Sequence, residues 1–153
     1  MTDNLSAFLD MIAACEGTGN AYNALFSYTP RNGRVFANDY LTHPNIKWPF
    51  TQMDGQPNFT TAAGRYQILH STFARLSAKL GLTDFSPATQ DAMAAELIAE
   101  DGAMSDVKNG NFQAAIDKCS GTWASLPASK YQQPKRSYDF ALNAYTEAGG
   151  VVA

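Results

Sequence analysis

Glu16 is the residue of this chain whose surroundings most favour acid–base chemistry. It lies in the string IAACEGTGN (residues 12–20), between an apolar stretch and a glycine. Because Ile12 precedes it by one helical turn, Glu16 extends a predicted apolar helix face, and Gly17 is typical of a helix end. Burial and the negative end of the helix dipole both disfavour the charged carboxylate. We therefore expect Glu16 to hold a proton near neutral pH and to deliver it, as cleavage of a glycosidic bond requires. The alternative is a solvated surface glutamate.

Two further strings carry groups suited to a polar ligand. In TAAGRYQIL (61–69), a turn of small residues precedes Tyr66 and Gln67. Amide and phenol groups bond sugar hydroxyls, and aromatic faces cover the apolar side of a pyranose. We expect both side chains to contact sugar rather than the core. The alternative is a plain helix start with Arg65 exposed. WASLPASKYQQ (123–133) reads as a helix end and a loop with one tyrosine, or as an ordinary surface loop with Trp123 in the core.

The elements that must position these residues are mainly helical. Apolar periodicity, caps and glycine stops predict one helix ending at Glu16 and four more over 71–81, 86–102, 111–121 and 135–150. Ser86 is the expected cap of the third helix, with Pro87 at its first position. The expected apolar faces consist of Leu5, Phe8, Leu9 and Ile12 in the first helix, Phe112, Ala115, Ile116 and Cys119 in the fourth, and Tyr138, Leu142 and Tyr145 in the last.

Residues 17–63 have a different composition, rich in Gly, Pro, Asn and Thr. The segment 25–38 reads as a strand, a turn and a second strand, and 43–64 reads as a long irregular loop. The sequence therefore predicts an α+β fold, with a helical lobe, a small β-hairpin and loop lobe, and a groove between them. The length of 153 residues predicts a single domain over 1–153.

Bulk composition excludes several classes of protein. Hydrophobic residues make up 45 % of the chain and the net charge is −3, so we expect a globular protein that does not bind nucleic acid. No segment is long and apolar enough for membrane insertion. Residues 12–15 resemble a lipoprotein cleavage box, but Asp3 and Asp10 precede it without any lysine or arginine, so we expect no signal peptide. Two cysteines and two histidines are too scattered for a metal site, and we expect no metal, no cofactor and no disulfide between Cys15 and Cys119.

Eight strings, in this order and near these spacings, carry a resemblance to a known family: FLDMIAACEGT, DYLTHP, AGRYQIL, GLTDFSP, QDA, QAAIDKCS, WASLP and EAGG. From about Phe8 to Gly150 the chain resembles the bacteriophage lambda lysozyme (endolysin) family of lytic transglycosylases. The segment from Asn20 to Val35 matches poorly. The resemblance implies a lysozyme-like fold and cleavage, without water, of the β-1,4 bond between N-acetylmuramic acid and N-acetylglucosamine in bacterial peptidoglycan.

The resemblance also implies roles for individual residues. Glu16 matches the catalytic glutamate of the family. The implied substrate-binding residues are Gly64, Arg65, Tyr66, Gln67, Ser125, Leu126, Pro127 and Tyr131, and the lips of the cleft match parts of 47–60 and 127–140. The implied partners are peptidoglycan glycan strands and a holin-type protein for release. The protein is then a monomer made in the host cytoplasm, acting on the periplasmic cell wall.

The number of carboxylates bears on the reaction. A hydrolytic lysozyme needs two carboxyl groups across the scissile bond, and Asp39 and Asp54 are the acids of the predicted β region. If both are turn aspartates, the muramoyl C6 hydroxyl must attack C1, with Glu16 acting first as acid and then as base. Two other classes stay open, a thiol peptidase using Cys15 with His43 or His70, and a non-catalytic glycan-binding module.

Overall fold

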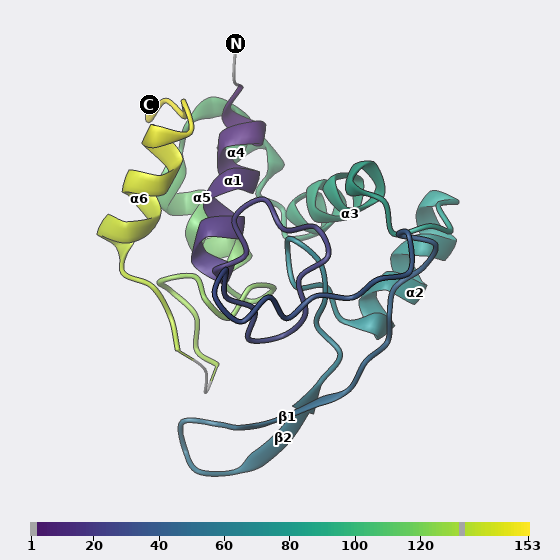
Figure 1. Cartoon of the computed structure of the whole chain (residues 1–153). Helices are drawn as coiled ribbons and strands as arrows, with labels where there is room; N and C mark the ends of the chain where they lie inside the picture. The colour runs from purple at the N-terminus through teal and green to yellow at the C-terminus, as the bar shows by residue number, and fades with distance from the viewer. Residues whose placement is uncertain (1–2, 132–133) are drawn as a thin grey trace. The chain divides into compact units, whose positions relative to one another are not determined.

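The computed structural model describes residues 3–131 and 134–153. Within this part of the chain, helices outnumber strands (Figure 1). In chain order the elements are α1 (Asn4–Glu16), β1 (Trp48–Thr51), β2 (Pro57–Thr60), α2 (His70–Leu80), α3 (Pro87–Glu100), α4 (Met104–Asn109), α5 (Phe112–Cys119) and α6 (Tyr138–Glu147). The predicted α+β class is confirmed.

The chain forms two compact units. One consists of Met1–Cys15 and Ala94–Ala153, and the other of Glu16–Met93. Helix α1 therefore belongs to the first unit except for its last residue, and α3 contributes a part to each. The single domain over 1–153 stays a prediction. No helix in the described ranges has the length and apolar character needed to cross a membrane.

The five helices that the sequence indicated are all present, with ends within three residues of those predicted, but the last begins at Tyr138 rather than near 135. Helix α2 stops at Gly81, whose φ of 68° and N–H bond to the Ser77 carbonyl form a left-handed cap. Helix α3 begins at Pro87, and the Ser86 hydroxyl accepts from the backbone N–H of Thr89 at 3.3 Å. The short helix α4 was not predicted, because six residues are too few to show a helical period.

The predicted apolar faces are confirmed for α5 and need correction for two other helices. Helix α1 is buried on most sides rather than along one stripe, while Leu5 is only half-buried. In α6 the buried residues are Ala141 and Tyr145, and Leu142 is exposed. The first unit is held by edge contacts of the Phe8 ring with Phe112 and Tyr145, whose centroids lie 6.2 and 6.5 Å away. The C-terminal residues lie beside the start of α1, because the N–H of Val151 donates to Asn4 at 2.9 Å.

The predicted hairpin over residues 25–38 is wrong. The two segments share one isolated bridge, Ala24 with Val35, while Leu25 bridges to Ala63 instead, and the rest of 25–38 is turns and irregular chain. The Asn32 side chain accepts from the backbone N–H groups of Thr29 and Arg34, both at 2.9 Å. Such local bonds offer the backbone an alternative to a strand ladder, which explains the outcome.

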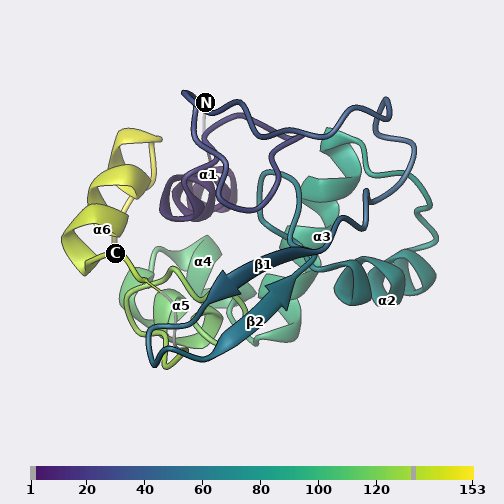
Figure 2. The same cartoon turned by 60° about the horizontal axis from the view of Figure 1, so that its bottom comes forward.

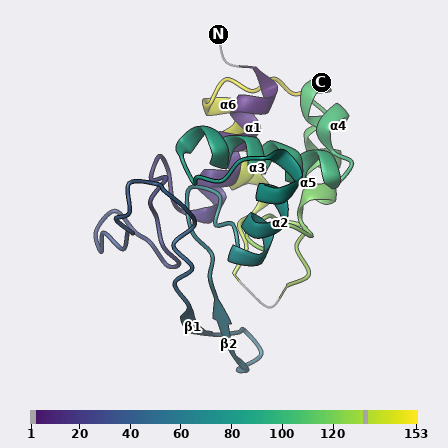
Figure 3. The same cartoon turned by 90° about the vertical axis from the view of Figure 1, so that its right-hand side faces the viewer.

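The two strands lie instead inside the stretch expected to be an irregular loop. Strands β1 and β2 pair antiparallel, with Trp48 opposite Thr60, and Figures 2 and 3 show them side by side as a hairpin. Its turn is closed by the Gly55 N–H to the Gln52 carbonyl at 2.9 Å and by Asp54, whose carboxylate accepts from the Gln56 N–H at 3.0 Å. An Asp-Gly turn pair with a glycine φ of 86° is typical of a hairpin.

Candidate active site

Glu16 is the last residue of α1 and is half-buried. Gly17 follows with a φ of 79°, a conformation that suits glycine and ends the helix where the sequence predicted. The carboxylate therefore belongs to the residue at which the chain leaves the helix. The contacts of the residues before and after Glu16 determine how rigidly its backbone is positioned.

The segment after Glu16 is fastened by one buried arginine. Arg65 is only 6 % exposed, and its Nε donates to the Gly19 carbonyl at 2.7 Å. A second guanidinium nitrogen reaches the Asn20 side chain at 3.3 Å, and the Thr18 hydroxyl donates to the Arg65 carbonyl at 2.5 Å. The structure thus brings the residues after Glu16 together with the predicted Gly64–Gln67 segment. The alternative with Arg65 exposed is wrong.

Tyr66 lies in the core, contrary to the expectation that its side chain faces sugar. It is 1 % exposed, and its hydroxyl donates to Asp91 at 2.6 Å and accepts from Arg65 at 2.9 Å. Tyr22 donates to the same Asp91 oxygen at 2.9 Å. Burial, followed by the bond to Asp91, raises the pKa of Tyr66, so the phenol stays protonated and keeps donating. The Tyr66 side chain therefore stabilises the Gly64–Gln67 segment from within the core.

Gly64 is required by a buried glutamine that the sequence did not indicate. At the φ of 84° of this glycine, an added Cβ would lie 2.3 Å from Oε1 of Gln90. Gln90 is fully buried and uses its amide completely, accepting from the Arg65 N–H at 2.9 Å and donating to the carbonyls of Tyr22 and Phe85 at 2.9 and 2.8 Å. A glutamine near a helix start carries no signal of this role.

Gln67 differs from its two neighbours, because its side chain is half-buried rather than enclosed. Its amide Nε2 donates to the Gly64 carbonyl at 2.9 Å, which bends the segment back on itself. The φ of 52° places Gln67 in the left-handed region, a conformation that non-glycine residues seldom adopt. Of the side chains of this segment, that of Gln67 is the one left to face a ligand.

The other predicted binding residues belong to the first unit. The Leu126 side chain is fully buried, so its predicted role in binding stays a prediction for the backbone of the turn. Trp123 is also buried, as the surface-loop alternative has it. Ser125 and Pro127 are half-buried. The hydroxyl oxygen of Ser125 is enclosed and has no hydrogen-bond partner in the described ranges. Tyr131 is exposed.

Arg136 connects this loop to the last turn of α1. Its backbone N–H donates to the Ser125 carbonyl at 2.8 Å, and its Nε donates to the Cys15 carbonyl at 3.3 Å. The guanidinium also lies over the Phe140 ring, 4.5 Å from the centroid. Arginine side chains near a helix C-terminus can bond the last carbonyls of the helix, and Arg136 does so here. Glu16 therefore follows a residue held by Arg136.

The two candidates for a second carboxylate occupy turns. Asp54 is exposed at the tip of the β1–β2 hairpin and caps the turn. Asp39 is exposed in a turn, with a φ of 56°. Both positions fit the turn and capping alternative.

The groups needed for a thiol peptidase are engaged elsewhere. Cys15 is buried, and its thiol donates to the Met11 sulfur at 3.7 Å. His43 is buried, with Nε2 bonded to the Ile68 carbonyl at 2.7 Å and Nδ1 accepting from the Asn45 N–H at 3.0 Å. Burial lowers the pKa of His43 to about 4, so the ring is neutral with both nitrogens occupied. Across the described ranges, no three His, Cys, Asp or Glu residues are placed to hold a metal ion.

Comparison with known proteins agrees with this arrangement. The family model described as Endolysin matches residues 6–152. The endolysin of Escherichia phage P2 is 36% identical over 158 residues, covering 98% of this chain and 95% of the relative, and that of Escherichia phage lambda is 39% identical over 149 residues, covering 95% and 91%. A bacteriophage lambda lysozyme complexed with a chitohexasaccharide superposes with a TM-score of 0.84 at 34% identity, covering 100% of this chain and 98% of the other.

The fold and the similarity to these endolysins together define the class of protein, which is a lysozyme-like glycosidase that degrades peptidoglycan. The chain belongs to the endolysin family, as the resemblance in its sequence implied. The alternatives of a thiol peptidase and of a non-catalytic glycan-binding module are thereby set aside.

Proposed function

We propose that this endolysin is a lytic transglycosylase that cleaves the β-1,4 bond between N-acetylmuramic acid and N-acetylglucosamine. The Glu16 proton passes to the glycosidic oxygen as the bond from C1 to that oxygen breaks. The muramoyl C6 hydroxyl then attacks C1, and its proton returns to Glu16. The new C1–O6 bond leaves a 1,6-anhydro ring on the muramoyl end, so no water is consumed.

The observation that supports this proposal is that three of the four other acids in Glu16–Met93, namely Asp54, Asp84 and Asp91, accept hydrogen bonds within the fold. Asp54 caps the hairpin turn, Asp84 accepts from the hydroxyls of Ser86 and Thr89 at the start of α3, and Asp91 accepts from two phenols. Asp39 stands exposed in a turn. A hydrolase requires an opposed carboxylate of its own, whereas intramolecular attack by the substrate does not.

The same contacts suggest how the chain prepares Glu16. Arg136 holds the carbonyl before it, and Arg65 holds the residues after it. Positioning of this kind lowers the cost of reaching the reactive geometry. For the glycan we propose contacts with Gln67 and Tyr131, whose side chains are accessible, and with the backbone around them. The chitohexasaccharide held by the lambda lysozyme supports a glycan ligand.

Mass spectrometry of murein digests tests the reaction. Muramoyl ends should be lighter by one water than hydrolysis products and should lack a reducing end. Glu16→Gln should abolish clearing of murein in a zymogram. Glu16→Asp should fail nearly as badly, because the shorter side chain draws the proton away from the glycosidic oxygen by more than a hydrogen bond tolerates.

The matched variants Asp39→Asn and Asp54→Asn distinguish the hydrolytic alternative. Both are turn aspartates on the surface of the same unit, and both should keep the activity and the anhydro product. Reducing muramoyl ends as the main product, together with loss of activity in one of these variants, would identify that aspartate as a second catalytic acid and contradict the proposal.

The resemblance also supports a proposal on where the enzyme acts. We propose a monomer, made in the host cytoplasm, that reaches the periplasmic wall with the help of a holin-type protein. Expression in host cells should cause lysis only when such a protein is co-expressed or the membrane is permeabilised. Lysis without either would contradict release by a holin.

A further inference from the structure

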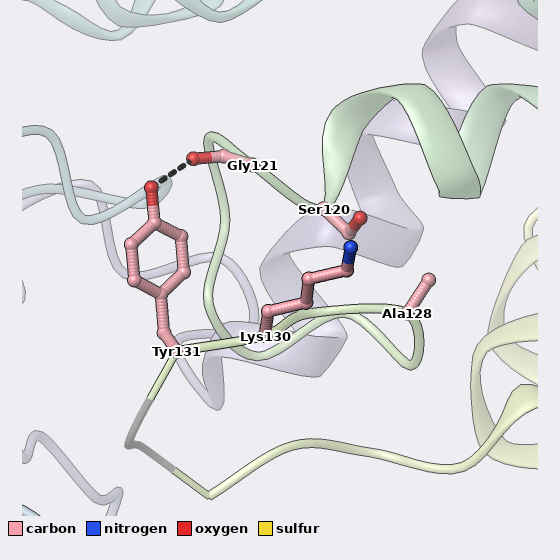
Figure 4. A pocket seen from close by; sticks show the side chains of 5 residues that line it. All are labelled: Ser120, Gly121, Ala128, Lys130 and Tyr131. Carbon is pink, nitrogen blue, oxygen red and sulfur yellow. Dashed lines mark hydrogen bonds between the residues drawn. The ribbon is translucent and has the colours of Figure 1, made fainter.

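A pocket of about 380 Å³ lies in the first unit, where the end of α5 meets the loop that follows it. Its lining residues are Ser120, Gly121, Ala128, Lys130 and Tyr131 (Figure 4). The Tyr131 hydroxyl donates to the Gly121 carbonyl at 2.6 Å, and its backbone N–H donates to the Ser129 hydroxyl at 3.2 Å. The first bond joins the two walls and the second lies within the loop that forms one of them. The volume is that of a small-ligand site.

The pocket presents one cation. Figure 4 shows the Lys130 side chain extending from its own wall toward Ser120, so that its ammonium group lies over the pocket. Ser120 is the C-cap of α5, and the negative end of the helix dipole attracts an ammonium group there. In the described ranges no carboxylate forms an ion pair with Lys130.

The acids near this pocket in the sequence are occupied. Asp117 accepts from the Tyr138 hydroxyl, and Asp101 accepts from the Thr122 hydroxyl at 2.6 Å. Lys130 is therefore an available cation in a chain whose net charge is −3. It stands beside the tyrosine ring and the Ala128 methyl group, which offer apolar surface.

Peptidoglycan contains one component that matches this combination. The rings of the glycan backbone are recognised through hydroxyl and acetamido groups, whereas the stem peptides attached to the muramoyl residues carry carboxylates next to short apolar side chains. We propose that this pocket binds a carboxylate-bearing stem peptide of the murein substrate, with Lys130 pairing with the carboxylate. The inference rests on the proposed action on murein and adds a peptide contact to it.

Three substrates separate the effect of the stem carboxylates from the effect of the stem peptides themselves. They are native murein, murein whose stem carboxylates have been converted to amides, and glycan strands stripped of their peptides by an amidase, with the lactyl carboxylates that this hydrolysis exposes then converted to amides as well. Lys130→Gln should lower kcat/KM on native murein about threefold to fivefold, the size of one exposed ion pair. The same substitution should not change kcat/KM on the other two substrates. The wild type should slow by a similar factor on the amidated murein, and the effects should not add, because both changes remove the same contact.

Matched variants control for charge and for fold. Lys108→Gln removes the same charge from the exposed surface of α4 and should cleave all three substrates at the wild-type rate. Lys130→Arg should keep the preference for charged stems, and added salt should weaken it. Equal losses of Lys130→Gln on all three substrates, or no loss on native murein, would overturn the proposal. The anhydro ends left by the wild type test the proposed reaction separately, since they do not depend on this preference.

Discussion

Replacing Gly64 with alanine should destabilise the protein far more than one methyl group would suggest. The left-handed φ of 84° costs a non-glycine residue about 1–2 kcal/mol. The new Cβ would also lie 2.3 Å from Oε1 of Gln90, so this fully buried amide must move. Its three hydrogen bonds, one from the Arg65 N–H and two to the carbonyls of Tyr22 and Phe85, would then be strained or lost. At about 1 kcal/mol each, the total loss is roughly 4–5 kcal/mol.

Gly81→Ala provides the matched control. Gly81 has a φ of 68°, but a Cβ there meets nothing within 4 Å, so Gly81→Ala bears only the same backbone cost of about 1–2 kcal/mol. Urea unfolding followed by circular dichroism measures both variants, and the difference between them isolates the steric term. The Gly64→Ala variant should also melt roughly 8–20 °C below wild type. Equal losses in the two variants would show that Gln90 can move aside freely, and would refute the assigned role of this glycine.

Three other changes follow from the same contacts. Tyr66→Phe should cost about 2–3 kcal/mol of unfolding free energy in a denaturant titration, because Asp91 loses a buried donor; no loss of stability would return Tyr66 to the set of sugar contacts. The pKa of His43 is about 4 in the fold against 6.5 ordinarily, so the unfolded chain binds a proton first as pH falls; stability should drop by about 3 kcal/mol between pH 6.5 and 4, and His43→Gln should show a shallower slope. Both cysteines are buried, and burial raises the pKa of Cys119 to about 12, so a thiol reagent should modify two free thiols only after unfolding, and a disulfide in protein purified without oxidant would contradict this.

Helix boundaries could be predicted from sequence because their signals are local. Ser86 and Pro87 at a start, and Gly81 at an end, act within one turn of the residue they mark. The hairpin of β1 and β2 was missed for an equally local reason. Pro49 and Pro57 lie within the strands, where proline is disfavoured, although the Asp-Gly pair at the turn favours a hairpin.

The candidate site was predictable in position and less so in the role of each residue. The helix end at Gly17 placed Glu16 correctly at the last residue of α1. Residue type alone, however, does not reveal a partner that lies far along the chain. The Tyr66 hydroxyl donates to Asp91, 25 residues along the chain. Because of this bond, a tyrosine that looks like a sugar-binding residue in the sequence is a buried structural residue in the fold.

Buried polar groups are a costly means of building a core, since apolar residues of similar volume often give equal or greater stability. The unit that contains Glu16 nevertheless encloses Arg65 and Gln90, and both bond to backbone atoms. Apolar contacts in a core still form when a loop shifts slightly. The hydrogen bond from the Arg65 guanidinium to the Gly19 carbonyl, at 2.7 Å, instead restricts the backbone around Gly19 to a narrow range of positions. Gly19 lies three residues after Glu16. The buried Arg65 and Gln90 therefore fix the chain where it leaves α1, and the proton transfer that we propose for Glu16 requires such accuracy.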